Sequence, residues 1–262
     1  MTVYLHELKR GRSTTLMWSA VIAFLLAVSS LIFPMMLDSI YELNQALQSM
    51  GDFASAFGIG KLGISDFIGY YSLECGEMLG IGGAIFAALC GISILSREEN
   101  EHTAEFLLTH PISRTRIAGE KLLSVFTHIT ALNLICSVVT FFCILIIGQH
   151  PSFRIMALIM LSYYLLHIEI AAISFGISAF LKGRGTGIGI GIALLFYFMS
   201  MLSNITDNMR FMQWLTPFSY ANGSWIAEHQ TLDFRFIAIG AAVSAAAIIA
   251  GFIKYNKKDI AA

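Results

Sequence analysis

Six long apolar stretches, separated by short charged segments, determine what this chain can fold into. They are residues 13–37, 76–96, 122–148, 155–181, 185–203 and 236–253. Each comes close to or exceeds the ~20 residues that a helix needs to cross the hydrocarbon core of a bilayer. Asp, Glu, Lys and Arg make up only 13% of the chain, against a usual ~25%, so too few charges remain to coat a water-soluble domain. The sequence therefore predicts an all-α membrane protein, with six transmembrane helices in a single domain over residues 1–262.

The positively charged residues are distributed unevenly between the two sides of the predicted membrane. With the N-terminus inside, 12 of the 16 Lys and Arg residues fall in cytoplasmic segments. The four on the outside are Lys61, Arg154, Arg210 and Arg235. Because cytoplasmic loops carry an excess of Lys and Arg, this asymmetry predicts that both termini are cytoplasmic. We expect a multi-pass protein of a bacterial plasma membrane.

Two segments outside the predicted spans have helical patterns of their own. In residues 1–12 the apolar side chains follow a helical spacing beside Lys9 and Arg10, which predicts a short interfacial helix on the inner leaflet. Residues 40–50 also keep a helical period. We therefore expect the first helix to continue past the membrane on the outer side.

The cytoplasmic loop between the second and third spans has a charged start, an apolar middle and a proline. Thr103 to His110 can form about two helical turns, and Pro111 disfavours helix at the residue before it. Ser113 is a predicted N-cap for a helix that starts at Arg114 and continues through the third span. Such an apolar segment suits the docking of another protein. The alternative is a short helix that lies in the lipid interface.

Several short motifs follow one another in order along the chain. In the loop they are Glu98-Glu99, Thr103-Ala104-Glu105-Phe106-Leu107-Leu108, Pro111-Ile112-Ser113-Arg114 and Gly119-Glu120-Lys121. Elsewhere they are residues 7–12, the turn Leu215-Thr216-Pro217-Phe218-Ser219-Tyr220 and the stretch Lys257-Lys258-Asp259. Their order, and their placement against six spans, resembles the ABC-2 type permeases, the transmembrane subunits of ATP-binding cassette exporters.

The resemblance implies a dimer of six-helix domains that another subunit powers. The second permease would be a further copy of this chain or a homologous one, and the helix between spans two and three would be a coupling helix that binds a cytosolic ABC ATPase. The chain has no G-x-x-x-x-G-K-[ST] motif, so we expect ATP and Mg²⁺ to bind to the partner. We expect this chain to bind no cofactor, metal or nucleic acid and to be no enzyme itself. The residues implied in ATPase coupling are Glu98, Glu99, Thr103, Glu105, Phe106, Leu107, Leu108, Pro111, Ser113 and Arg114.

Small residues form regular rows in the second and fifth spans, and such rows let transmembrane helices approach closely. Packing within one chain would explain them. In the resembled family these two spans line the central cavity and part of the dimer seam, which implies a functional role as well. The candidates for pathway or seam are Gly80, Gly83, Ala84, Ala87, Gly187 and Gly191.

Glu169 is an acidic residue deep in a predicted span, where a charge costs about 2.5–3.5 kcal/mol on insertion scales. It could face a wet cavity and contact cargo, pair with His128 of the third span, or be protonated. A hydrogen bond to a neighbouring helix would give it a structural role instead. His167 lies on a different face of the same helix and cannot be its close partner.

The outer segment from Asn204 to Arg235 is too apolar for a free loop. Its aromatic residues suit the membrane interface, where they would form a plain aromatic belt. The resemblance implies instead a short re-entrant element that caps the cavity on the outside. The candidates for this outer gate are Trp214, Pro217, Phe218 and Tyr220.

The main alternative function is an ion-gradient-driven secondary transporter or channel. Internal repeats and helices broken near the midplane would be expected of it, and the six spans show no such halves. A membrane enzyme is disfavoured because the sequence contains no catalytic constellation. A cavity built from Gly, Ala, Met and aromatic residues favours hydrophobic or amphipathic cargo. We rank amphipathic, antimicrobial-type peptides before drugs and lipids.

Overall fold

The structure of the protein, a computed structural model, describes residues 2–37, 39, 66–101, 112–183, 185–205 and 207–258. Within these ranges the chain forms helices and short connections, and no strand. Six of the helical segments are long and apolar enough to cross a membrane. The predicted all-α architecture with six spans is confirmed. The predicted helical continuation over residues 40–50 lies outside the described residues.

Five of the described spans contain one long α-helix each, which a 3-10 turn (Phe33–Met36) extends in the first span, and the second span is composite. The single helices are α1 (Thr2–Ile32), α8 (Arg114–Ile146), α9 (Phe153–Ser178), α10 (Thr186–Ile205) and α12 (Phe234–Lys257). The second span consists of α4 (Phe67–Tyr70), the π-helical turn η2 (Tyr71–Cys75) and α5 (Gly76–Ile92). The shorter described elements are η1 (Phe33–Met36), α6 (Arg97–Asn100), η3 (Asp207–Trp214), η4 (Pro217–Tyr220) and α11 (Gly223–His229).

The first span differs from the prediction at its start. Residues 2–12 do not form a separate interfacial helix; they are the first turns of α1, which runs unbroken to Ile32. These turns pack on α8: the Tyr4 amide donates to Glu120 at 3.1 Å, and the Tyr4 hydroxyl is hydrogen bonded to Thr127 at 3.1 Å. Residues 2–12 therefore contact protein on one side, and their placement on the inner leaflet stays a prediction.

The second span also begins earlier than its apolar pattern indicates. Asp66 caps α4, and its carboxylate accepts a hydrogen bond from the Gly69 amide at 3.0 Å. Glu74 interrupts the apolar stretch but is exposed, whereas Tyr71 and Cys75 on the same turn are buried. One charged position on an exposed face therefore does not stop the helix. At α8 the prediction is confirmed, because Ser113 is its N-cap.

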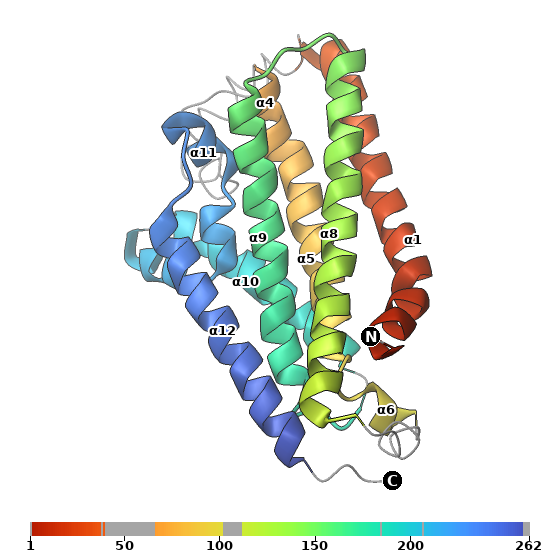
Figure 1. Cartoon of the computed structure of the whole chain (residues 1–262). Helices are drawn as coiled ribbons and strands as arrows, with labels where there is room; N and C mark the ends of the chain where they lie inside the picture. Colours follow the sequence, from red (N-terminus) through yellow and green to blue (C-terminus); the bar gives the residue numbers. More distant parts are fainter. Residues whose placement is uncertain are drawn as a thin grey trace.

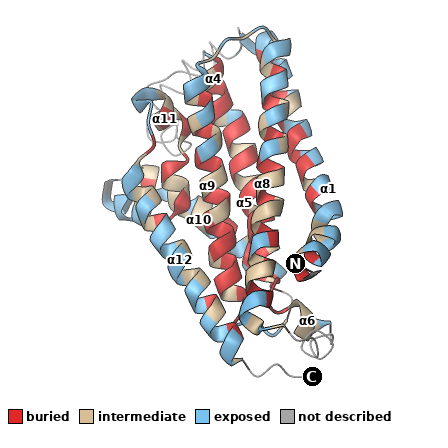
Figure 2. Cartoon of the chain, viewed as in Figure 1, coloured by how far each residue is buried: buried red, intermediate tan, exposed pale blue. Residues whose placement is uncertain are grey.

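Burial divides the bundle into a central and a peripheral part (Figures 1 and 2). In the most apolar stretches of the second span and of α9, 61% and 56% of the residues are buried, whereas the values are 17% in α10 and 11% in α12. The largest helix contacts join α1 to α8, α5 to α9 and α9 to α12. Helices α10 and α12 therefore present broad faces to lipid or to another chain.

Two glycines allow the central helices to approach closely. A Cβ on Gly91 of α5 would lie 2.5 Å from the carbonyl oxygen of Ala171 in α9, and a Cβ on Gly176 of α9 would lie 2.5 Å from the carbonyl oxygen of Ala247 in α12. In lipid, such close contact supplies the packing energy that the hydrophobic effect supplies in water. Helix α1 begins at the end of the bundle that carries α6, and helix α12 terminates there (Figure 1).

Candidate functional site

The short helix α6 follows the second span and is joined to α1 by two ion pairs. The Arg97 guanidinium contacts the Glu7 carboxylate at 2.7 Å, and Arg10 donates to the Glu101 carboxylate just past the end of α6. Glu7 is buried, so its pair with Arg97 is shielded from water, whereas the pair of Arg10 lies at the surface. Both ends of α6 are thereby held against the first turns of α1.

Lys121 of α8 is fully buried and binds the middle of α6. Its ammonium lies 2.5 Å from both carboxylate oxygens of Glu98 and donates to the Ile94 carbonyl at 2.6 Å. A buried charge costs several kcal/mol unless it is paired and hydrogen bonded. Removal of either partner would leave an uncompensated charge, so this pair fixes the position of α6 relative to α8.

Lys258, which follows α12, connects three further parts of this end of the bundle. Its ammonium lies 2.8 Å from Glu99 and donates to the Leu181 carbonyl, also at 2.8 Å. Its own carbonyl accepts a hydrogen bond from Arg114 of α8 at 2.6 Å. The predicted coupling residues Glu98, Glu99 and Arg114 therefore belong to one cluster of contacts. We call these contacts, together with the two ion pairs between α1 and the α6 region, the α6 ion-pair cluster.

The remaining predicted coupling residues are placed only in part. Ser113 accepts a hydrogen bond from the Arg116 amide at 3.3 Å as the cap of α8. The others lie outside the described residues: Thr103, Glu105, Phe106, Leu107, Leu108 and Pro111. In the sequence, residues 102–111 connect Glu101, which follows α6, to Ile112, which precedes α8.

Glu169 is buried in α9 and pairs with the segment between α10 and α12. The Tyr220 hydroxyl donates to its Oε2 atom at 2.8 Å. Burial, reinforced by the nearby Glu169, raises the pKa of Tyr220 well above its ordinary value, so this hydroxyl remains a donor. Gly240 of α12 faces the same carboxylate, because a Cβ there would collide with it. The proposed partner His128 instead binds Thr15 of α1, at 2.7 Å.

The outer-gate candidates lie in the short helices between α10 and α12. Pro217 and Tyr220 of η4 are buried. Trp214 is 49% exposed, and its ring packs on that of Phe236 in α12 with a centroid distance of 4.9 Å. The Thr216 hydroxyl that caps η4 donates to the carbonyl of Phe196 in α10 at 2.7 Å. This segment is therefore held between α9, α10 and α12.

A sequence profile described as ABC-2 family transporter protein matches residues 1–260, nearly the whole chain. The chain belongs to this family. It is thus a multi-pass membrane permease of an ABC transporter, and its family implies an ATPase partner. No curated protein matches the chain.

The small residues proposed for the pathway or dimer seam of this ABC-2 permease have two different environments. The first group is buried in α5 and consists of Gly80, Gly83, Ala84 and Ala87. A Cβ on Gly83 would collide with the His167 ring of α9, so this row packs within the chain. Gly187 and Gly191 of α10 form the second group, and a Cβ on either would have no neighbour within 4 Å among the described residues.

Sequence reasoning missed two features of this permease. The partners Lys121 and Lys258 are remote from α6 in sequence, so no local pattern reveals them. Glu77 lines a cavity between α5, α9 and α10. Its position between Gly76 and Gly80 could have indicated that Glu77 faces a cavity, because an acid within a row of small residues faces protein or a cavity more readily than lipid.

Proposed function

We propose that the chain forms half of the membrane pathway of an ATP-driven exporter and couples to a separate cytosolic ABC ATPase. The α6 ion-pair cluster carries this proposal. The segment 102–111, implied to bind the ATPase, starts directly after Glu101, and α6 is joined to α1, α8 and Lys258. A displacement of this segment would therefore move three parts of the bundle together.

In this proposal the end of the bundle that carries α6 is cytoplasmic, and the pathway is completed by a second permease, either a copy or a homologue. The open face of α10 around Gly187 and Gly191 supports a seam there, because small residues let two transmembrane helices pack closely. Exposed Ile188 and Leu195 belong to the same helix. The cargo is hydrophobic or amphipathic, with amphipathic peptides ranked first.

The experiment that tests coupling compares two substitutions that place the same charge at opposite ends of the molecule. The full chain is co-expressed with its ABC ATPase subunit, and ATP-dependent uptake of a dansyl-labelled amphipathic peptide is measured in inside-out vesicles. We expect Phe106→Asp to abolish co-purification of the ATPase and uptake. Phe153→Asp is the matched control, because Phe153 is 80% exposed at the outer start of α9.

Two results would contradict the proposal. One is ATPase binding and uptake by Phe106→Asp at the level of the control. The other is transport by the chain alone, driven by an ion gradient, which would favour the secondary transporter.

A further inference from the structure

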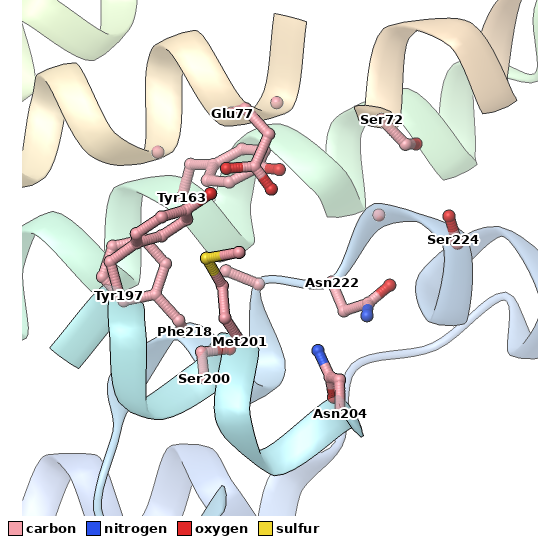
Figure 3. A pocket seen from close by; sticks show the side chains of 14 residues that line it. Ser72, Glu77, Tyr163, Tyr197, Ser200, Met201, Asn204, Phe218, Asn222 and Ser224 are labelled. Atoms are coloured by element: carbon pink, nitrogen blue, oxygen red, sulfur yellow. The ribbon is translucent and has the colours of Figure 1, made fainter. Parts of the chain in front are cut away.

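A polar cavity of about 50 Å³ lies at the outer end of the bundle, between α5, α9, α10 and the segment that follows η4 (Figure 3). Figure 3 shows Glu77, Tyr163 and Tyr197 gathered on one side of it and Asn204 and Asn222 on the other. Three helices and a connecting segment thus supply polar side chains to this cavity, although each of these elements is largely apolar.

The lining of this cavity contains one acidic residue. Among the described residues that line it, Glu77 alone is ionisable to a charged form near neutral pH. Tyr197 lines the cavity on the same side as Glu77, and Asn222 is fixed in place because its side-chain oxygen accepts from the Trp225 amide at 3.0 Å. None of the described residues that line the cavity is basic, and an intramembrane acid of this kind indicates a functional site.

Glycines keep the cavity open. A Cβ on Gly76 would collide with the Tyr163 hydroxyl, and one on Gly223 would lie 2.5 Å from the Ser72 hydroxyl oxygen. Larger residues at these positions would push polar side chains into the space. The cavity is therefore set by the backbone path of α5 and of α11, and not by the rotamer of one flexible side chain.

We propose that this cavity binds the ammonium group of a cationic amphipathic molecule, with Glu77 as its counter-ion. An ammonium offers three donors, which the carboxylate and the surrounding hydroxyl and amide oxygens can accept. The faces of Tyr197 and Phe218, whose centroids are 5.6 Å apart, add aromatic surface that attracts a cation. The small volume admits a head group only, so the apolar part remains outside the cavity.

The inference rests on the proposed function in one respect, since it names the chemical class of the cargo. The same ammonium chemistry has two sources, a cationic peptide or drug and an aminophospholipid of the membrane. Binding is therefore measured without ATP or ATPase. If the wild-type chain does not bind the ammonium probe, this inference alone is overturned, whereas a wild-type chain that binds the probe but never exports overturns the proposed function alone.

The test uses the full chain in phosphatidylcholine nanodiscs and titrates dodecylammonium, with neutral dodecanol as the uncharged probe and empty nanodiscs as the blank. We expect Glu77→Gln to weaken dodecylammonium binding by about tenfold or more, equivalent to ~1.4 kcal/mol, and to leave dodecanol unaffected. Glu74→Gln is the matched control, because Glu74 is three residues away, exposed, and outside the lining of the cavity. It should bind dodecylammonium as the wild type does.

A second variant tests the same cavity independently, in case Glu77→Gln fails to fold. Ser200→Leu fills the cavity from α10 without a change of charge, and it should also lose dodecylammonium binding. Equal binding by wild type and Glu77→Gln, or by wild type and Ser200→Leu, overturns the proposal. Addition of phosphatidylethanolamine to the nanodiscs identifies the source: competition indicates an aminophospholipid and its absence a cationic cargo, and either supports an ammonium site.

Discussion

The Tyr220 hydroxyl donates a hydrogen bond of 2.8 Å to Glu169 and so ties the outer segment to α9, in the interior of the bundle. Both residues are buried, at 3% and 7% exposure. An acid without this donor would have to be satisfied by another group or by water, since an unpaired buried polar group costs ~1–3 kcal/mol. The position of η4 therefore depends on whether Glu169 accepts this hydrogen bond.

Tyr220→Phe should lower the stability of the chain by about 1–3 kcal/mol, because it leaves the Glu169 carboxyl group without its donor. Thermal unfolding in detergent measures this. Tyr164→Phe is the matched control, since the Tyr164 hydroxyl of the same bundle binds Thr130 at 3.1 Å but remains only half-buried. If the two variants lower the stability equally, the hydrogen bond to Glu169 contributes no more to stability than the hydrogen bond to Thr130.

The Glu169→Gln variant tests whether Glu169 acts in transport or only stabilises the fold. An amide retains an oxygen that can accept from Tyr220, so we expect folding to be preserved within about 1 kcal/mol and export to fall. ATP-dependent peptide uptake and thermal unfolding are measured on the same preparation. Unchanged export with unchanged stability would remove the functional case for Glu169.

Gly240→Ala should destabilise the chain, because the new Cβ collides with the Glu169 carboxylate. Overpacking of this kind typically costs about 1–3 kcal/mol. Gly119→Ala in α8 is the control: the nearest atom to its Cβ is Phe252 Cζ at 4.0 Å, so alanine should be neutral or stabilise the helix by up to ~1 kcal/mol. A Gly240→Ala variant as stable as Gly119→Ala would contradict the close packing of α9 and α12.

Lys121→Met should destabilise the end of the bundle that carries α6, since it leaves the partly buried Glu98 without its partner. Breaking a buried pair costs about 3–5 kcal/mol, and the 16% exposure of the Glu98 side chain reduces the effect toward the lower limit. The measurement is thermal unfolding together with ATP hydrolysis of the complex. The Glu98→Lys, Lys121→Glu double variant should recover part of the loss, and a double variant no better than Lys121→Met would argue against a specific pair.

Gly187→Leu and Gly191→Leu should impair assembly or export but leave the stability of the isolated chain within ~0.5 kcal/mol, because nothing within the described residues lies near either position. Light scattering of the purified protein reports the oligomer, and vesicle uptake reports export. Gly183→Leu, which also has open space but precedes α10, is the control. A normal oligomer with normal export for Gly187→Leu would exclude a seam at this face.

Much of the fold could be predicted because its determinants are local. The apolar stretches gave the six spans, and Ser113 indicated the start of α8. The start of the second span could not be predicted, since exposure of Glu74 depends on how the surrounding helices pack. For the same reason the sequence did not indicate that Tyr4, in the predicted interfacial segment, contacts α8.

The candidate sites were less predictable than the spans, because their contacts join remote residues. Glu169 was recognised as unusual from the cost of a charge in lipid, but its partner Tyr220 lies in another element and His128 was an equally reasonable choice. Likewise, Glu98 and Glu99 were expected to act in coupling, but the sequence did not indicate that Lys121 and Lys258 bind them.

The arrangement around α6 has a mechanical consequence. Arg97, Glu98, Glu99 and Glu101 are held by α1, α8 and Lys258, which approach the short helix from separate parts of the bundle. A shift that lengthens one of these contacts does not leave the others in place, so small displacements are resisted in several directions at once. If an ABC ATPase acts on this element as we propose, the element is expected to move between two discrete positions and not gradually, so that the pathway moves only above a threshold force.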